Sequence, residues 1–322
     1  MPILLASFLC LTALSAEDRP TVIIVVGAPG SADYEPEFRR WADLWQAASS
    51  KAGADSIRIG EAKDDPASTG NDRDRLRSAL AEHASGTAPL WLVLIGHGSF
   101  DGREAKFNLR GPDVSEVELA GWLESVKRPI AVLDCSSSSG PFLSKLSGEG
   151  RVVVAATRSG NESNFARFGQ YLAESIADPR ADLDKDGQVS LLEAYLAASS
   201  RTEEFYKSKS RLSTEHALLD DNGDKLGTPA DWFRGVRATK RAKDGAPADG
   251  LRAHQWHLVP SDRERALPPE VRRDRDRIEL AIAALRDEKP RLAEDDYYAR
   301  LEALMVELAR LYGGHLRASA GP

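Results

Sequence analysis

Two side chains that can do hydrolytic chemistry each follow an apolar run of this sequence. His97 comes after the run 91–95 and one glycine, and Cys135 comes after the run 130–133 and one aspartate. An imidazole can take a proton from a thiol, and the resulting thiolate is a strong nucleophile. The pair therefore predicts a cysteine hydrolase, provided that the fold brings the two side chains together.

The elements that must position this pair are parallel strands. Apolar runs alternate with segments of helical spacing between residues 21 and 177, which predicts an α/β fold with a mostly parallel sheet and helices on both sides. Parallel strands all end at one edge of the sheet, and the crevice there is where open α/β sheets hold their sites. We predict strands at 21–26, 55–59, 89–95, 130–133 and 152–155, and helices at 36–52, 72–83, 114–126 and 165–176.

Size, charge and cysteine content narrow the class of protein. The 322 residues, 42% of them hydrophobic, suffice for one large core plus an appended piece. A formal net charge of −7 argues against a general nucleic-acid binder, which would show a basic face.

The first sixteen residues predict a secretory signal, and hence a secreted or periplasmic protein. Their apolar stretch ends in Ser15 and Ala16, small residues suited to cleavage. A buried first strand or helix is the alternative. Cleavage would remove Cys10 and leave Cys135 as the single cysteine, which cannot form an internal disulfide.

The chain changes character after residue 235. We interpret residues 236–268 as a linker, because the stretch 239–250 is rich in Lys, Ala, Asp and Gly. Residues 269–313 predict an antiparallel helical hairpin, with leucines at three- and four-residue steps and a turn at 289–290. We expect this hairpin to serve packing or to form a homo-oligomer. No segment after the signal is long and apolar enough to span a membrane.

The order of these motifs resembles the caspase–legumain clan of cysteine peptidases, in its bacterial type. The resemblance rests on His97-Gly98, on the strand that ends at Cys135 and on the stretch 151–169, and it covers residues 21–235. It implies a caspase-like three-layer α/β/α sandwich and a peptide or protein substrate. Cys135 would then attack a peptide carbonyl, His97 would deliver a proton to the leaving amine, and the N–H groups of Gly98 and Cys135 would hold the oxyanion.

The chain departs from the clan's pattern at the nucleophile. Clan members carry the cysteine two residues before a Ser-Gly pair; here that pair is 139–140 and Ser137 stands two residues before it. Counting by the clan's Asp-x-Cys pattern gives Ser136 instead. A β-bulge or a longer elbow would bring Cys135 into place. Otherwise Ser136 or Ser137 occupies the nucleophile position, and a serine without a strong adjacent base is a poor nucleophile.

Two functions therefore stay open at the level of sequence. The first is a cysteine endopeptidase that uses a dyad of His97 and Cys135. The second is a catalytically inactive caspase-like domain that binds peptides or proteins and is stabilised by calcium.

The calcium prediction comes from residues 182–193, which match an EF-hand loop at each diagnostic position. Gly187 falls at position 6, where the loop turns sharply. Oxygen ligands of this kind suit Ca²⁺, so we predict one structural calcium ion; an acidic surface loop with a helix cap at Ser190 is the alternative. The predicted ligands are Asp182, Asp184, Asp186, Gln188 through its backbone carbonyl, Ser190 through a water, and Glu193.

Two other groups of polar residues are weaker candidates for an ion site. The acidic turn 220–224 lacks the full ligand spacing and is interpreted as a plain turn. His254 and His257 lie in the predicted linker and have no metal ligands near them in the sequence.

Overall fold

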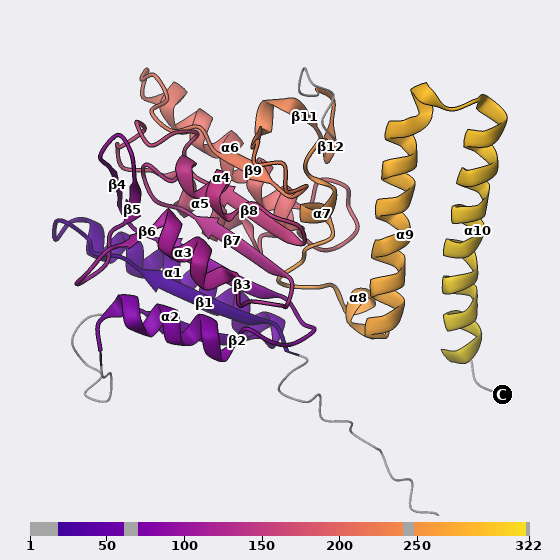
Figure 1. Cartoon of the computed structure of the whole chain (residues 1–322), viewed down its shortest axis with the longest axis horizontal. Coiled ribbons are helices and arrows are strands. Elements are labelled where there is room, and N and C mark those ends of the chain that lie inside the picture. Colours follow the sequence, from indigo (N-terminus) through magenta and orange to yellow (C-terminus); the bar gives the residue numbers. More distant parts are fainter. Residues whose placement is uncertain (1–18, 61–69, 241–247, 320–322) are drawn as a thin grey trace, which may run out of the picture.

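The computed structural model describes residues 19–60, 70–240 and 248–319, so the predicted signal at 1–16 lies outside the described residues. Its main sheet has the strand order β10-β9-β8-β7-β3-β1-β2 (Figure 1). Five neighbouring strands are parallel, and β9 and β10 add an antiparallel edge. The strands are β1 Thr21–Val26, β2 Asp55–Ile59, β3 Leu90–Ile95, β7 Ile130–Asp134, β8 Arg151–Ala155, β9 Leu218–Asp220 and β10 Thr228–Pro229.

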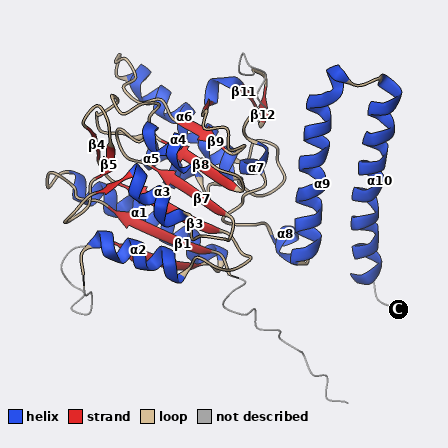
Figure 2. Ribbon diagram, in the orientation of Figure 1, coloured by secondary structure: helices blue, strands red, loops and turns tan. Residues whose placement is uncertain are grey.

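Helices cover both faces of this sheet (Figure 2). Successive strand side chains point to opposite faces, so β1 sends Val22 and Ile24 to one apolar layer and Ile23 and Val25 to the other. The structure thus confirms a three-layer α/β/α arrangement with a mostly parallel sheet. The first layer holds α1 Tyr34–Ala52, α5 Phe168–Ser175 and α6 Leu191–Ser208; the second holds α2 Asp72–Glu82, α3 Glu116–Leu123 and α4 Gly140–Leu146.

Helix starts are set by polar groups that accept the free backbone N–H groups of the first turn. α3 begins after Ser115, whose side chain caps Glu118 in a capping box. α5 begins three residues later than the predicted helix 165–176, because the Glu215 carboxylate accepts the N–H groups of Arg167 and Phe168. Glu215 lies far away in the sequence, so this start was not predictable from local spacing.

Part of the predicted linker 236–268 lies in the core, which corrects that interpretation. Ala253, Trp256 and Leu258 are buried in the layer that contains α1 and α6. The Asp221 carboxylate accepts the N–H groups of Gly250 and Ala253 and so holds the short helix α7 Leu251–His254 against the acidic turn after β9.

The remaining short elements carry too little periodicity for a prediction from sequence. They are β4 Gly98–Phe100, β5 Ala105–Phe107 and β6 Val114–Ser115, which form a small sheet, together with β11 Phe233–Arg234, β12 Arg237–Ala238 and α8 Asp262–Ala266.

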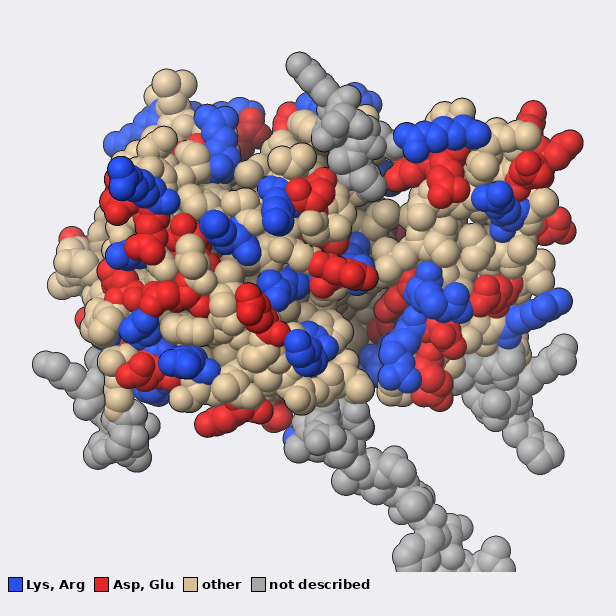
Figure 3. All heavy atoms as spheres, viewed as in Figure 1, with Lys and Arg blue, Asp and Glu red and all other residues tan. Residues whose placement is uncertain are grey.

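The C-terminal hairpin stands beside the sheet domain, with α9 nearer to the sheet and α10 outermost (Figure 1). It consists of α9 Pro269–Glu288, a short 3-10 turn at Lys289–Arg291 and α10 Glu294–Ser319, close to the predicted bounds. Acidic and basic side chains are interspersed over the visible face of both parts (Figure 3). Among the described residues, none of the helices has both the length and the apolar character that a membrane span needs.

Candidate functional site

His97 lies at the carboxyl ends of the strands, where the strand order reverses between β1 and β3. Such a switch point leaves a crevice above the sheet. Its Nε2–H donates to the Pro29 carbonyl at 3.1 Å, and its ring packs on Tyr34, Phe38 and Phe165 at centroid distances of 4.8, 5.2 and 5.8 Å. Burial among these rings lowers the pKa of His97, so the imidazole is neutral at pH 7.

Cys135 lies in the apolar core. Its side chain is 1% exposed and belongs to the layer between the sheet and α1 and α5. Gly169 of α5 packs so closely that a Cβ there would be 2.5 Å from the Cys135 Cβ. Burial raises the pKa of the thiol, and the adjacent Asp134 carboxyl raises it further, so the sulfur stays protonated.

This placement corrects the expectation that two strand ends present an imidazole and a thiol to a shared cleft. Cys135 continues the row of Ala131 and Leu133, which faces the core because strand side chains alternate. The one hydrogen bond described for its thiol is a long contact of 3.9 Å to the Leu133 carbonyl. Within the described ranges, no hydrogen bond joins Cys135 to His97.

The two serines that could replace the cysteine are held by other partners. The Ser136 hydroxyl donates to Asp134 Oδ1 at 2.6 Å and is fully buried. The Ser137 hydroxyl donates to the Gly98 carbonyl and accepts the Gly98 N–H, both at 3.1 Å. The N–H group of Gly98, the predicted oxyanion donor, is therefore already hydrogen-bonded. A Cβ added at Gly98 would lie 2.1 Å from the Ser137 carbonyl oxygen, so only glycine fits there.

Two buried polar atoms at this strand end have no hydrogen-bond partner in the described structure. They are Oδ2 of Asp134 and the hydroxyl of Ser138. Ser138 also has a φ of 56°, a left-handed conformation that is rare for a residue with a side chain. Burial raises the pKa of Asp134 to about 7. Sequence reasoning missed Ser138, because nothing in a run of four serines singles it out.

A polar cluster centred on Glu162 borders the same strand ends. Its carboxylate accepts from His216 Nδ1 at 2.6 Å and forms an ion pair with Arg158 at 3.1 Å. Its backbone carbonyl accepts the Ser138 N–H at 2.9 Å. Arg158 and Glu162 thus offset each other's charge at this edge of the sheet.

The loop 182–193 brings three of its predicted ligands together. Asp182, Asp184 and Asp186 each offer one carboxylate oxygen, and these oxygens all lie within 4.8 Å of one another. Lys185 and Gly187 have φ values of 64° and 91°, and their N–H groups donate to Asp182 at 2.6 and 3.2 Å. The clustered carboxylates form an oxygen-only donor set, which fits a hard cation such as Ca²⁺.

Glu193 is the closing ligand of the predicted cage, and it is almost fully buried. Its Oε1 accepts the N–H groups of Leu183 and Asp184 at 2.7 and 3.2 Å. Its Oε2 accepts the N–H and the hydroxyl of Ser190, both at 2.8 Å, as part of the capping box of α6. The side-chain amide oxygen of Gln188 is engaged outside the carboxylate cluster, because it accepts the Ser261 N–H at 3.0 Å.

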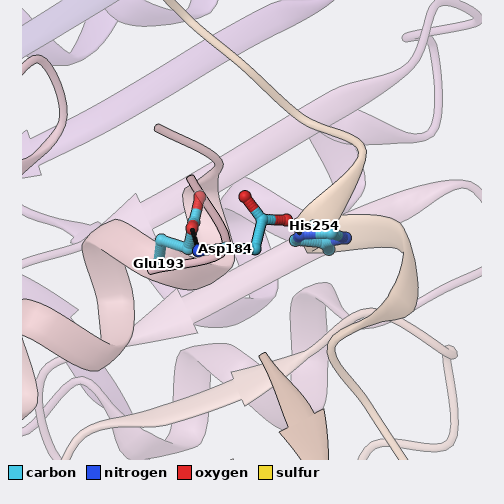
Figure 4. Close-up of side chains that lie close together, drawn as sticks. All are labelled: Asp184, Glu193 and His254. Carbon is cyan, nitrogen blue, oxygen red and sulfur yellow. Dashed lines mark hydrogen bonds and ion pairs between the residues drawn. The ribbon is translucent and has the colours of Figure 1, made fainter. Parts of the chain in front are cut away.

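The C-terminal segment closes the outer side of this loop. Ser190 forms an antiparallel β-bridge with His257, and the Leu191 N–H donates to the Trp256 carbonyl at 2.7 Å. His254 Nε2 lies 2.9 Å from Asp184 Oδ2 (Figure 4). His254 has no metal ligands near it in the sequence, but the fold brings it into direct contact with Asp184, which lies 70 residues away along the chain.

Comparison with known proteins gives matches among solved structures only. No family model and no curated protein matches the chain. The initiator caspase Dronc of Drosophila is similar at 14% identity and a TM-score of 0.45, over 66% of this chain and 83% of that one. Caspase-1 of Spodoptera frugiperda is similar at 9% identity and a TM-score of 0.39, over 64% of this chain and 87% of that one. Raptor of Chaetomium thermophilum is similar at 10% identity and a TM-score of 0.31, over 50% of this chain and 18% of that one. These values describe a shared arrangement of sheet and helices and imply nothing about activity.

Proposed function

We propose that this chain is a catalytically inactive caspase-like domain that binds peptides or proteins and is stabilised by calcium. The observation that carries this proposal is the burial of Cys135, which is 1% exposed and packs under Gly169. A nucleophile must reach the substrate carbonyl as a thiolate. A protonated thiol enclosed by apolar side chains meets neither condition.

The other parts of the expected hydrolytic machinery are also engaged. His97 Nε2 is bonded to Pro29, and the Gly98 N–H is bonded to Ser137. The cysteine endopeptidase with a dyad of His97 and Cys135 would require the thiol to turn out of the core and both hydrogen bonds to break. The resemblance to the caspase–legumain clan supplies the partner class, since it implies a peptide or protein substrate.

The loop 182–193 supports the calcium part of the proposal. Three carboxylates, those of Asp182, Asp184 and Asp186, converge there, and the basic side chain of Lys185 contacts the backbone carbonyl of Asp182. A divalent cation would offset the mutual repulsion of these groups. We also propose that the protein is secreted or periplasmic, as the first sixteen residues suggest, since free calcium outside the cytoplasm is sufficient for a weak structural site.

The test of inactivity is hydrolysis of protein substrates. Wild-type chain, Cys135→Ala and His97→Ala are incubated with a denatured protein mixture and calcium, and new N-termini are counted by mass spectrometry. We expect the three samples to match a buffer control, because no activated nucleophile is available. Cleavage by the wild-type chain that both substitutions abolish would establish the endopeptidase instead.

A further inference from the structure

An imidazole from outside the loop joins two of the predicted calcium ligands. Asp184, Glu193 and His254 each place one potential ligand atom within 4.8 Å of the others. The three side chains come from the loop, from α6 and from α7, and they converge on one point (Figure 4). This group shares only Asp184 with the clustered carboxylates of Asp182, Asp184 and Asp186, so the loop offers two alternative donor sets.

The donor chemistry of the second set differs from that of a calcium site. Calcium takes oxygen ligands at 2.3–2.6 Å, whereas imidazole nitrogen suits first-row transition metals. Zinc binds His nitrogen and carboxylate oxygen at roughly 2.0–2.2 Å in tetrahedral geometry, which sets two ligand atoms about 3.3 Å apart. His254 Nε2 and Asp184 Oδ2 are 2.9 Å apart in a direct contact, so an ion between them requires only a small outward shift of the two side chains.

We propose that Asp184, Glu193 and His254 form a binding site for Zn²⁺, which differs from the proposed calcium site in the same loop by its imidazole ligand and its metal preference. His254 and Asp184 are partly exposed, with side-chain exposures of 35% and 29%, so water can complete the coordination. Glu193 is the buried ligand and would exchange one of its hydrogen bonds to Ser190 for the ion.

The imidazole is held in place by contacts on both sides of it in the chain. Asp221 accepts the N–H groups of Gly250 and Ala253 at 3.0 and 2.8 Å, which fixes α7. Beyond the ring, the Trp256 carbonyl accepts the Leu191 N–H. Because its backbone is fixed in this way, the His254 side chain loses little conformational entropy when it binds an ion. This favours a specific site over non-specific surface binding.

Zinc at this position would join segments that the sequence separates. Asp184 belongs to the loop after α5, whereas His254 belongs to the segment that leads into α9. The Gln255 side chain already donates to the Asp276 carbonyl of α9 at 2.9 Å. The ion would therefore fasten the C-terminal segment to the domain.

The experiment is a zinc titration of metal-stripped full chain by calorimetry, with Co²⁺ as a spectroscopic substitute. We expect one site, and a loss of affinity of at least about 100-fold in His254→Gln, since even outer-shell partners are worth about 10–100-fold. His83→Gln is the matched control, because His83 ends α2 on the opposite face of the sheet. Asp186→Ala should keep zinc affinity within about threefold and should weaken calcium binding.

A calcium titration of the same variants separates the two proposals. His254→Gln should bind calcium as the wild type does. If the wild-type chain binds zinc through His254 and does not bind calcium at all, only the calcium proposal is refuted. Protection of His254 from diethyl pyrocarbonate by Zn²⁺ in the wild-type chain gives a readout that needs no variant. Equal zinc affinity in His254→Gln and wild type, or modification of His254 unaffected by zinc, would overturn the proposal.

Discussion

At the scale of single residues, burial decides the chemistry of the strand end after β7. Cys135 and Asp134 are adjacent in sequence, and both side chains are cut off from water. For both groups burial disfavours the charged form, so the thiol keeps its proton and the pKa of Asp134 rises to about 7. The sequence thus contains the residue types of a nucleophilic His–Cys pair, but the packing keeps the thiol buried and protonated.

The raised pKa of Asp134 makes stability depend on pH. Between about pH 4 and pH 7 the folded protein holds a proton that the unfolded chain releases, so stability falls as pH rises through this window. The loss is at most about 4 kcal/mol, from the difference between 3.8 and about 7. We expect urea unfolding of Asp134→Asn to show a flatter profile over this range.

Asp231→Asn is the control for this pH series, since the Asp231 side chain is 70% exposed and pairs with Lys240 at the surface. Its pH profile should follow that of the wild type. A profile of Asp134→Asn as steep as the wild type's would show that Asp134 is ionised in the folded protein.

At the scale of elements, strong periodicity made the main strands and helices predictable. The runs 21–26 and 55–59 became β1 and β2 with the predicted bounds. The loop 182–193 folded with the expected turn at Gly187. Contacts distant in sequence were not predictable: the cap that Glu215 provides for α5, and the approach of His254 to Asp184, each join segments more than 40 residues apart.

The candidate site was predictable in position and not in orientation. The sequence placed His97 and Cys135 at the carboxyl ends of two neighbouring strands, and the structure has both there. Whether a side chain one residue beyond a strand faces the crevice or the core depends on a single step of alternation. Gly169 packs against Cys135 in the core-facing orientation, and no local pattern reveals this contact between separate elements.

The loop 182–193 gives the prediction at this scale. Removal of calcium by a chelator should lower the melting temperature, because an ion present at 100 times its dissociation constant adds about 2.7 kcal/mol to stability. For a chain of 322 residues that corresponds to roughly 4 °C. Differential scanning calorimetry of wild type and Asp182→Ala measures the shift.

Asp182→Ala should melt at the same temperature with and without chelator, whereas Asp231→Ala should behave as the wild type. A wild-type chain that is insensitive to chelator would leave the loop as an acidic surface turn with a capped helix.

At the scale of the whole molecule, the outer face of the C-terminal hairpin is not covered by any other described part of the chain. α10 packs on α9, yet Tyr298, Met305 and Val306 remain 49%, 50% and 39% exposed. The first turn of α10 is acidic and Arg310 lies toward its other end, so two antiparallel copies would set opposite charges side by side. We propose that a second copy of the chain covers this face.

Light scattering after size exclusion tests this assembly. The wild-type chain should have the mass of a dimer, and Met305→Glu should convert it to a monomer by placing a charge in the apolar contact. Ala303→Glu adds the same charge on the other flank of α10 and should leave the dimer intact. A monomeric wild type would refute the proposed contact.

The proposed inactivity of the domain rests on the position of one sulfur atom, and the reactivity of that sulfur is the most direct measurement. A Cys10→Ala chain, in which Cys135 is the only thiol, is treated with iodoacetamide at pH 8 and the adduct is followed by mass spectrometry. The structure predicts negligible labelling of the folded protein and complete labelling in denaturant. Rapid labelling of the folded chain that His97→Ala slows would contradict the account, because it would show a thiolate paired with that imidazole.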